Sequence, residues 1–356
     1  MTSKHIVVIG AGYAGLSAAT RAGRGGARVT LVAPEARLLH RIRLHETAAG
    51  RDVPRPAIAH VLRGRPVTHL QAKVTELDLA GRKVFTDTGE TLAYDTLVYA
   101  LGSRTAWQDV PGAAEHAYSA ERAEEVNRRI QASPVPGTVA VVGGGSTGIE
   151  LAAELAEAHP DWQVRIVAAG AVGGHFSERG RAHVRKVLDG LGVVFHEHTP
   201  VTAVTADALE TAAGPVPADL VVWAASLEVN PLAAEAGLAV ASNGQAVVDD
   251  HLRSVSHPDV HVVGDAAAVV LPGIGRLRMA CATAQPMGAY VGKLLAGRTD
   301  KPFGYRYITQ CLSLGRREAL VQLIHADDSM RQGIITGPLG RLTKALIVNA
   351  VPLSLR

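Results

Sequence analysis

Two glycine-rich turns with the same spacing are the residues of this 356-residue chain best suited to binding a reactive group. Each follows an apolar run, at 6–9 or 138–142, and precedes a helical stretch and a second apolar run, at 28–32 or 163–167. In such a βαβ unit the first glycine permits a tight turn, the second lets a pyrophosphate approach the backbone, and the third lets the helix pack closely. The two sets are Gly10, Gly12 and Gly15, and Gly143, Gly145 and Gly148. This repeated fingerprint predicts two dinucleotide sites.

The position that usually presents an acid to the nucleotide ribose holds alanine in both units. Ala33 ends the first unit, with Glu35 two residues later, and Ala168 ends the second. A carboxylate there would bind the ribose hydroxyl of NAD, and a nearby arginine would accommodate the extra phosphate of NADP. The sequence therefore does not choose between NADH and NADPH.

Further polar candidates lie in the segment 40–50 and at Asp265. Arg43, His45 and Glu46 fall in the first of these, which is either a solvated, charged helix start or a segment that lines the site and delivers protons. Asp265 follows the apolar run 260–263, where a helix cap and a ligand contact are both open interpretations.

The alternation of apolar runs with helical stretches predicts an α/β fold with two Rossmann-like domains, three-layer sheets and a small C-terminal α+β region. We expect residues 1–107 and 241–300 to form a first, discontinuous domain, 108–240 a second, and 301–356 an interface region. Strands are expected over 67–77, 193–203, 308–314 and 320–325, and helices over 283–295 and 338–349. Pro286 suits the first turn of the former helix.

Composition excludes several classes of protein. The formal net charge of +3 is too small to indicate a nucleic-acid partner, and 15 scattered histidines do not have the spacing of a metal site. Two distant cysteines, Cys281 and Cys311, support no disulfide framework, so a cytoplasmic location is the simpler expectation. The first apolar run begins too early to follow a signal peptide, and no run approaches the ~20 residues that span a bilayer.

The two fingerprints, the YALG turn at 99–102 and the VGDAAAV segment at 263–269 together resemble flavoproteins of the pyridine nucleotide-disulfide oxidoreductase group. The similarity is greatest to type II NADH dehydrogenases and their shorter soluble relatives. It implies FAD at the first site and NADH or NADPH at the second. The residues implied to bind FAD are Gly10, Gly12, Tyr13, Ala14, Gly15, Glu35, Arg43, Val74, Ala100, Gly102, Gly264, Asp265, Ala284 and Gln285. Those implied for the nicotinamide nucleotide are Gly143, Gly145 and Gly148, with Glu150 near the nicotinamide.

The chain departs from the disulfide reductases of that group because residues 10–60 contain no cysteine. We therefore predict an FAD-dependent NAD(P)H oxidoreductase that passes electrons to a quinone-like or other small aromatic acceptor, without a redox disulfide. His45, Glu46 and Glu150 are the candidate catalytic residues. A flavoenzyme that tailors one metabolite, and a flavin-bound redox sensor without turnover, remain alternatives.

The C-terminal helical stretch places Leu339, Leu342 and Leu346 on one face, with two basic residues on the other side and no acid. Such a helix could dock on the core or on a second subunit, as in a homodimer. Alternatively, it could lie peripherally on an anionic membrane at the inner face.

Overall fold

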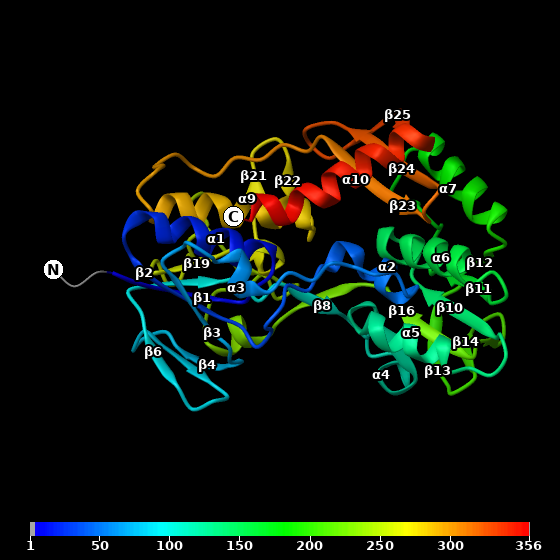
Figure 1. The fold of residues 1–356 in the computed structure, drawn as a ribbon, viewed down its shortest axis with the longest axis horizontal. Coiled ribbons are helices and arrows are strands. Elements are labelled where there is room, and N and C mark those ends of the chain that lie inside the picture. The colour runs from blue at the N-terminus through cyan, green and yellow to red at the C-terminus, as the bar shows by residue number, and fades with distance from the viewer. Residues whose placement is uncertain (1–3, 356) are drawn as a thin grey trace.

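The computed structural model describes residues 4–355 and contains two five-stranded parallel sheets, one in each half of an elongated molecule (Figure 1). The first sheet has the order β19 (Val260–Val262), β7 (Thr96–Tyr99), β1 (His5–Ile9), β2 (Arg28–Val32), β3 (Val67–Leu70). The second has the order β12 (Val194–His196), β11 (Gln163–Val167), β10 (Thr138–Val142), β16 (Leu220–Trp223), β9 (Ala117–Ser119). The predicted pair of Rossmann-like domains is confirmed.

Each glycine fingerprint lies between a central strand and a helix. In the first half, β1 leads into α1 (Tyr13–Ala22), and in the second, β10 leads into α6 (Ser146–Ala158). All five residues of β1 are buried, as expected of a parallel strand covered on both faces. The small residues of α1 allow α9 (Cys281–Leu295) to pack against its backbone: a Cβ at Gly288 would overlap the carbonyl oxygen of Ala14.

Two expected strands are divided in the structure. The stretch 67–77 splits into β3, which joins the parallel sheet, and β4 (Val74–Asp78), which begins an antiparallel meander with β5 (Lys83–Thr86) and β6 (Thr91–Ala93). The stretch 193–203 likewise divides into β12 and β13 (Val201–Val204), and the latter pairs with β14 (Ala208–Thr211). Strand propensity alone does not reveal where a chain leaves one sheet for another.

The start of α9 differs from the expectation. The helix begins at Cys281, where the hydroxyl of Thr283 donates to the carbonyl oxygens of Arg278 and Ala280. Pro286 consequently lies in the second turn of the helix and not in the first turn, where it was expected. This earlier start matters because it brings Cys281 to the opening of the helix.

The C-terminal region is a three-stranded antiparallel sheet covered by one helix. Its elements are β23 (Thr309–Leu314), β24 (Glu318–Ile324), β25 (Met330–Ile335) and α10 (Gly337–Ser354). The sequence prediction missed β25, whose run MRQGII contains polar residues and a glycine. The helix packs on β24 and β23 and extends back toward the first half of the molecule (Figure 1).

Short elements connect the two halves. The antiparallel pair β8 (Ser103–Thr105) and β17 (Leu227–Val229) carries the chain across and back. The helix α2 (Leu44–Ala48), from the N-terminal part of the chain, packs against α5 (Ala123–Gln131) and α6 of the second half. A helix long and apolar enough to cross a membrane does not occur within residues 4–355. The expected domain boundaries stay a prediction.

Candidate active site

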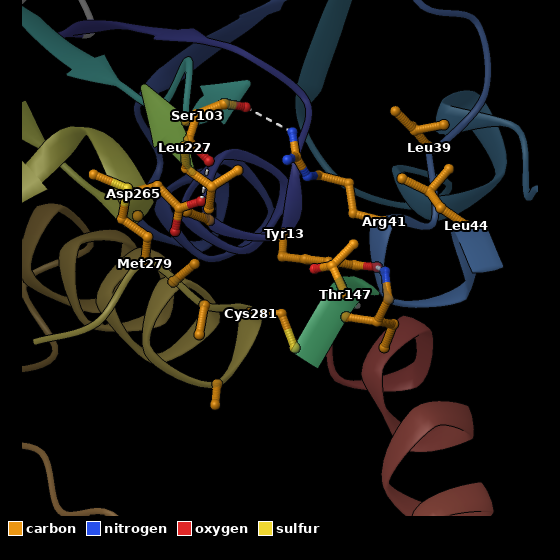
Figure 2. Close-up of a pocket in the computed structure, with 18 of the residues that line it drawn as sticks. Tyr13, Leu39, Arg41, Leu44, Ser103, Thr147, Leu227, Asp265, Met279 and Cys281 are labelled. Atoms are coloured by element: carbon orange, nitrogen blue, oxygen red, sulfur yellow. Dashed lines mark hydrogen bonds between the residues drawn. The ribbon is translucent and has the colours of Figure 1, made fainter. Parts of the chain in front are cut away.

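A cavity of about 1050 Å³ is lined by both halves of the molecule and by the C-terminal region. Both glycine turns, the start of α9, strand β23 and helix α10 contribute to its wall. Figure 2 shows Tyr13, Thr147 and Cys281 around one part of it. One continuous space therefore contacts the two predicted nucleotide sites.

The two glycine turns have the same geometry. Gly10 and Gly143 adopt φ of +97° and +124°, a region that side chains rarely tolerate. A Cβ on Gly15 would overlap the carbonyl oxygen of Gly10, so helix and strand are in close contact there. By contrast, apart from the chain neighbours of each glycine, no atom of residues 4–355 lies within 4 Å of a Cβ built on Gly12, or on Gly145 in the second turn. The backbone is therefore open to a ligand at these two positions.

A polar cluster lies beside the first turn. The hydroxyl of Ser103 donates to Oδ2 of Asp265 at 2.6 Å, and Nη1 of Arg41 donates to the Ser103 carbonyl oxygen at 2.6 Å (Figure 2). Nη2 of the same arginine donates to Glu121 at 2.9 Å. Oδ1 of Asp265 is buried and has no hydrogen-bond partner among the described residues. A buried oxygen without a partner is unfavourable, so this atom calls for a donor from a ligand.

A second polar group contains His45, Glu150 and Lys344, which all line the cavity and come from α2, α6 and α10. Nζ of Lys344 donates to Oε1 of Glu150 at 2.8 Å, and Nδ1 of His45 lies 3.8 Å from Oε2. The backbone N–H of Ser313 also donates to the glutamate, at 2.9 Å. Nε2 of His45 is buried without a hydrogen-bond partner in residues 4–355.

The electrostatics of this group favour an ion pair beside a neutral imidazole. Burial raises the pKa of Glu150, but the charge and the hydrogen bond of Lys344, together with the backbone N–H of Ser313, outweigh burial and leave that pKa below its usual value. Burial lowers the pKa of Lys344, and Glu150 reverses that effect, so the ammonium stays protonated. For His45, burial dominates and lowers the pKa.

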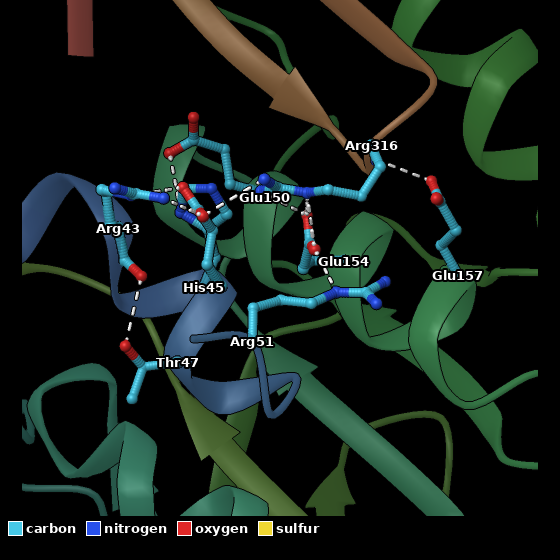
Figure 3. Close-up of polar contacts among 9 residues, drawn as sticks. Arg43, His45, Thr47, Arg51, Glu150, Glu154, Glu157 and Arg316 are labelled. Atoms are coloured by element: carbon cyan, nitrogen blue, oxygen red, sulfur yellow. Dashed lines mark hydrogen bonds and ion pairs between the residues drawn. The ribbon is translucent and has the colours of Figure 1, made fainter. Parts of the chain in front are cut away.

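Arg43 and Glu46 form an ion pair with each other. The guanidinium of Arg43 donates to both carboxylate oxygens of Glu46, at 2.9 and 2.7 Å, and Arg316 lies 3.2 Å from the same carboxylate (Figure 3). Neither residue belongs to the cavity wall formed by the described part of the chain. Their predicted roles as FAD ligand and proton donor find no geometric support, because the paired ions satisfy each other.

Side chains beside the second glycine turn are hydrogen-bonded to one another. The hydroxyl of Ser146 lies 3.1 Å from Nε2 of His175 and accepts from the side-chain amide of Gln310 at 3.0 Å. Gln310 in turn accepts from Nη1 of Arg278 at 2.7 Å. Ala168 is buried at the end of β11, as the sequence indicates.

The two cysteines also line the cavity. Cys281 lies at the start of α9, and Cys311 lies in β23. Burial raises the pKa of the Cys281 thiol to about 11, so it stays protonated at neutral pH.

The structure contains several cavity residues that the sequence did not single out: Arg41, Ser103, Arg278, Gln310 and Lys344. Among the predicted residues, fourteen contribute to the wall: Gly10, Gly12, Tyr13, Ala14, Glu35, His45, Val74, Ala100, Gly102, Gly145, Glu150, Gly264, Asp265 and Ala284. The sequence did contain one signal for Lys344. The helix around it has no acidic residue that could pair with its charge, which indicates a partner elsewhere in the fold.

Comparison with known proteins identifies the family. The model of the pyridine nucleotide-disulphide oxidoreductase family matches residues 4–288. This chain belongs to that family. An NADH dehydrogenase-like protein of Mycobacterium tuberculosis is 30% identical over 319 residues, which cover 81% of this chain and 79% of the relative. The type II NADH:quinone oxidoreductase of Staphylococcus aureus is 27% identical, with 89% of each chain covered.

Solved structures of similar fold agree. NDH2 of Plasmodium falciparum in complex with NADH has a TM-score of 0.84 at 14% identity and covers 99% of this chain and 97% of its own. The sulfide:quinone oxidoreductase of Aquifex aeolicus has a TM-score of 0.81 at 19% identity and covers 99% and 92%. These likenesses show the fold. The family and the relatives identify the chain as an NAD(P)H-dependent flavin oxidoreductase that uses FAD and NADH or NADPH.

The first site of this pyridine nucleotide-disulphide oxidoreductase fits FAD. Gly12 leaves the backbone open, and Oδ1 of Asp265 lacks a donor among residues 4–355. Glu35, three residues after β2, and Val74, the first residue of β4, also line the wall. Ala284, in the first turn of α9, lines the same cavity, where the helix N-terminus presents a positive potential. A dinucleotide with hydroxyl groups along its linker would satisfy the unpartnered oxygen.

Proposed function

We propose that this enzyme passes electrons from NAD(P)H through FAD to a quinone-like or other small aromatic acceptor, without a redox disulfide. The observation that carries the proposal is the buried group of His45, Glu150 and Lys344 in the wall of the cavity that contacts both glycine turns. FAD, when bound, supplies the chemistry that accepts hydride and delivers electrons singly or in pairs.

Reduction of a quinone requires protons as well as electrons, and the three side chains are suited to provide them. Lys344 holds its proton at Nζ because Glu150 stabilises the charge. His45, neutral at pH 7, carries one N–H and one free nitrogen, so it can donate at one atom while it accepts at the other. We assign the proton-transfer role to His45 and Glu150, and no longer to Glu46.

The absence of a redox disulfide is part of the proposal. A thiol with a pKa of about 11, as at Cys281, is a poor nucleophile at neutral pH. Residues 10–60 of this chain contain no cysteine that could exchange with it. Electrons therefore leave directly to the acceptor.

We propose that the exposed face of α10 contacts a membrane, from which a quinone would enter. Leu339, Leu342 and Leu346 are 62%, 57% and 64% exposed, whereas Lys344 points inward to Glu150. The leucine face, for which docking on the core was one expectation, is thus exposed, and the opposite face of α10 packs on β24. Leu342→Glu with Leu346→Glu should abolish sedimentation with anionic vesicles, and Val135→Glu, at another exposed apolar site, should not.

We keep the predicted domain assignment within this proposal: residues 1–107 and 241–300 bind FAD, 108–240 bind NAD(P)H, and 301–356 form the interface region. The parallel sheets with their glycine turns support it. A homodimer through the α10 leucines is the competing outcome of the vesicle experiment, and would appear as a change in sedimentation coefficient in the same double variant.

A metabolite-specific acceptor is a second candidate, because one end of the cavity is strongly polar. Nε of Arg278 lies 2.7 Å from Asp328, and its Nη1 donates to Gln310. A plain quinone would not need this cation. Steady-state rates with a series of quinones, with and without carboxylate substituents, would separate the two acceptor classes.

Rapid mixing tests the proton-transfer role. His45→Asn should leave anaerobic flavin reduction by NAD(P)H within twofold of the parent and slow reoxidation by a soluble quinone by about 100-fold, the usual contribution of a general acid. His198→Asn, an exposed residue with φ of +53° that asparagine tolerates, is the matched control. Equal reoxidation rates in the two variants would contradict the role of His45.

A further inference from the structure

One arginine outside the cavity, Arg316 in the turn between β23 and β24, reaches both helices that carry the proton-transfer residues (Figure 3). Its Nη1 lies 3.2 Å from Oε2 of Glu46, the residue after His45 in α2. Its Nε donates to Oε1 of Glu154 at 3.0 Å, one helical turn beyond Glu150 in α6. A single planar guanidinium thus joins α2 to α6 close to His45 and Glu150 in the sequence of each helix.

The turn that carries this arginine is itself fixed. Gly315 has φ of +76°, and a Cβ there would overlap the carboxylate of Glu157. That carboxylate accepts the backbone N–H of Arg316 at 2.8 Å. On the other side, Nη1 of Arg341 in α10 donates to the Arg316 carbonyl oxygen at 3.4 Å, one turn before Lys344. All three helices of the proton-transfer group therefore contact this one turn.

The carboxylates that Arg316 joins have little freedom. Glu154 is fully buried, with Arg51 and Arg316 as its two cationic partners, and a buried carboxylate is stable only when paired. Glu46 is held from its other side by the bidentate contact with Arg43. Removing the central guanidinium would break the ionic link between Glu46 of α2 and Glu154 of α6, and Arg51, three residues after α2, would remain beside Glu154.

We infer that Arg316 is a positioning residue that sets His45 of α2 beside Glu150 of α6 for reduction of the acceptor. The inference rests on the proposed function and extends it to a residue outside the cavity. The fork of an arginine is needed because it can bind two carboxylates at once, whereas the ammonium of a lysine is a compact charge on a flexible stem.

The kinetic test compares Arg316→Lys with Arg317→Lys, its exposed neighbour, in the FAD-loaded full-length protein. We expect Arg316→Lys to retain flavin reduction by NAD(P)H within twofold and to slow reoxidation by a soluble quinone on the order of tenfold, the scale of a small misplacement of reacting groups. Arg317→Lys should match the parent in both. If both half-reactions of Arg316→Lys fall together, Arg316 is merely structural and the inference is overturned.

A second readout does not depend on turnover. Glu150 and Glu154 of α6, Lys344 of α10 and Glu46 of α2 face the imidazole of His45, and burial keeps its pKa low. If the link through Arg316 holds α2 in place, Arg316→Lys should raise the His45 pKa toward the ordinary 6.5, as followed by NMR with His45→Asn to assign the signal. An unchanged titration would overturn the inference, even if the parent protein proved not to reduce quinones.

A double-mutant cycle with Glu46→Gln tests whether the loss in Arg316→Lys comes from the contact between Arg316 and Glu46. Glu46→Gln removes one carboxylate of the link and keeps the side-chain shape. Because both changes break the same contact, the double variant should lose no more reoxidation rate than the slower single variant. Independent, additive losses would contradict the positioning role. If neither NADH nor NADPH reduces the parent flavin, the proposed function fails, and the His45 titration alone decides on Arg316.

Discussion

The first and second nucleotide sites share the geometry of their turns and differ in what surrounds them. Gly12 and Gly145 both leave open space, and Gly10 and Gly143 both need positive φ. Beside the first turn, however, Asp265 keeps a buried oxygen without a partner in the described chain. Beside the second, the hydroxyl of Ser146 already contacts His175 and Gln310.

The difference matches two modes of binding. A buried, unsatisfied oxygen makes the empty first site unfavourable, so a bound dinucleotide is stabilised there and stays. The Ser146 hydroxyl is already hydrogen-bonded, so a ligand there would exchange one set of hydrogen bonds for another, which suits a coenzyme that must leave after each turnover. The same fingerprint can thus hold a resident cofactor in one half and a transient donor in the other.

Matched alanine substitutions should separate the two sites most strongly. Gly12→Ala should fold, since its Cβ meets no protein atom, but should be isolated without FAD. Gly145→Ala should keep FAD and raise the KM for NAD(P)H by on the order of tenfold, about 1.4 kcal/mol. Visible spectra and steady-state kinetics provide the measurements. Loss of flavin from Gly145→Ala would contradict the assignment of FAD to the first glycine turn and of NAD(P)H to the second.

Asp265→Asn should weaken FAD binding by ten- to a hundred-fold, because hydrogen bonds to a charged group contribute about 1.5–3 kcal/mol. Flavin fluorescence during titration of the apoprotein would measure the loss. Asp161→Asn, at an exposed position, is the control. Equal FAD affinity in the two variants would remove the unpartnered oxygen from the account of the first site.

Introducing an acid at the ribose position should increase the preference of the second site for NADH over NADPH. Ala168→Asp places a carboxylate at the end of β11 and should shift the ratio of kcat/KM values toward NADH by about tenfold, since a 2′-phosphate is repelled and a ribose hydroxyl is bound. Ala169→Asp, exposed and one residue later, should change the ratio little. An unaltered preference in Ala168→Asp would mean that the ribose lies elsewhere.

A buried histidine near the first glycine turn, His40, should make the free energy of unfolding depend on pH. His40 is buried, its Nδ1 lies 2.8 Å from the hydroxyl of Tyr13, and burial together with Arg43 lowers its pKa from 6.5 to about 4. The unfolded chain therefore binds a proton below pH 6.5 that the folded protein does not, and stability falls as pH drops toward 4. Between pH 7 and 5 the loss should be on the order of 1–2 kcal/mol, and His40→Gln should reduce it in urea denaturation. An identical slope in the variant would contradict the assignment.

The smallest effect is expected at the cysteines. Cys281→Ser with Cys311→Ser should change quinone reduction by less than about threefold, because a protonated thiol takes no part in electron transfer without a redox disulfide. Single-turnover reoxidation is the measurement. A loss of two orders of magnitude would instead mean that the two thiols exchange electrons with the flavin.

The sequence was sufficient for the elements that follow a repeating local rule. Both βαβ units, the position of Asp265 after a strand and the two glycine turns could be predicted, because each depends on residues close in the chain. Lys344 could not, since its partner Glu150 is distant in sequence. Of the alternatives for the leucine face of α10, docking on the core is the one that the exposed leucines contradict. Arg43 and Glu46 were attractive as charges, but only tertiary packing reveals that they satisfy each other.

Anaerobic titration of the purified protein with NADH and, separately, NADPH tests the central claim most directly. The account predicts a flavin absorption band that copurifies with the protein, bleaches with at least one donor, and returns on addition of a soluble quinone. A protein that retains FAD but is bleached by neither nucleotide would contradict the assignment of the second glycine turn to the donor. A protein without FAD would contradict the assignment of the first.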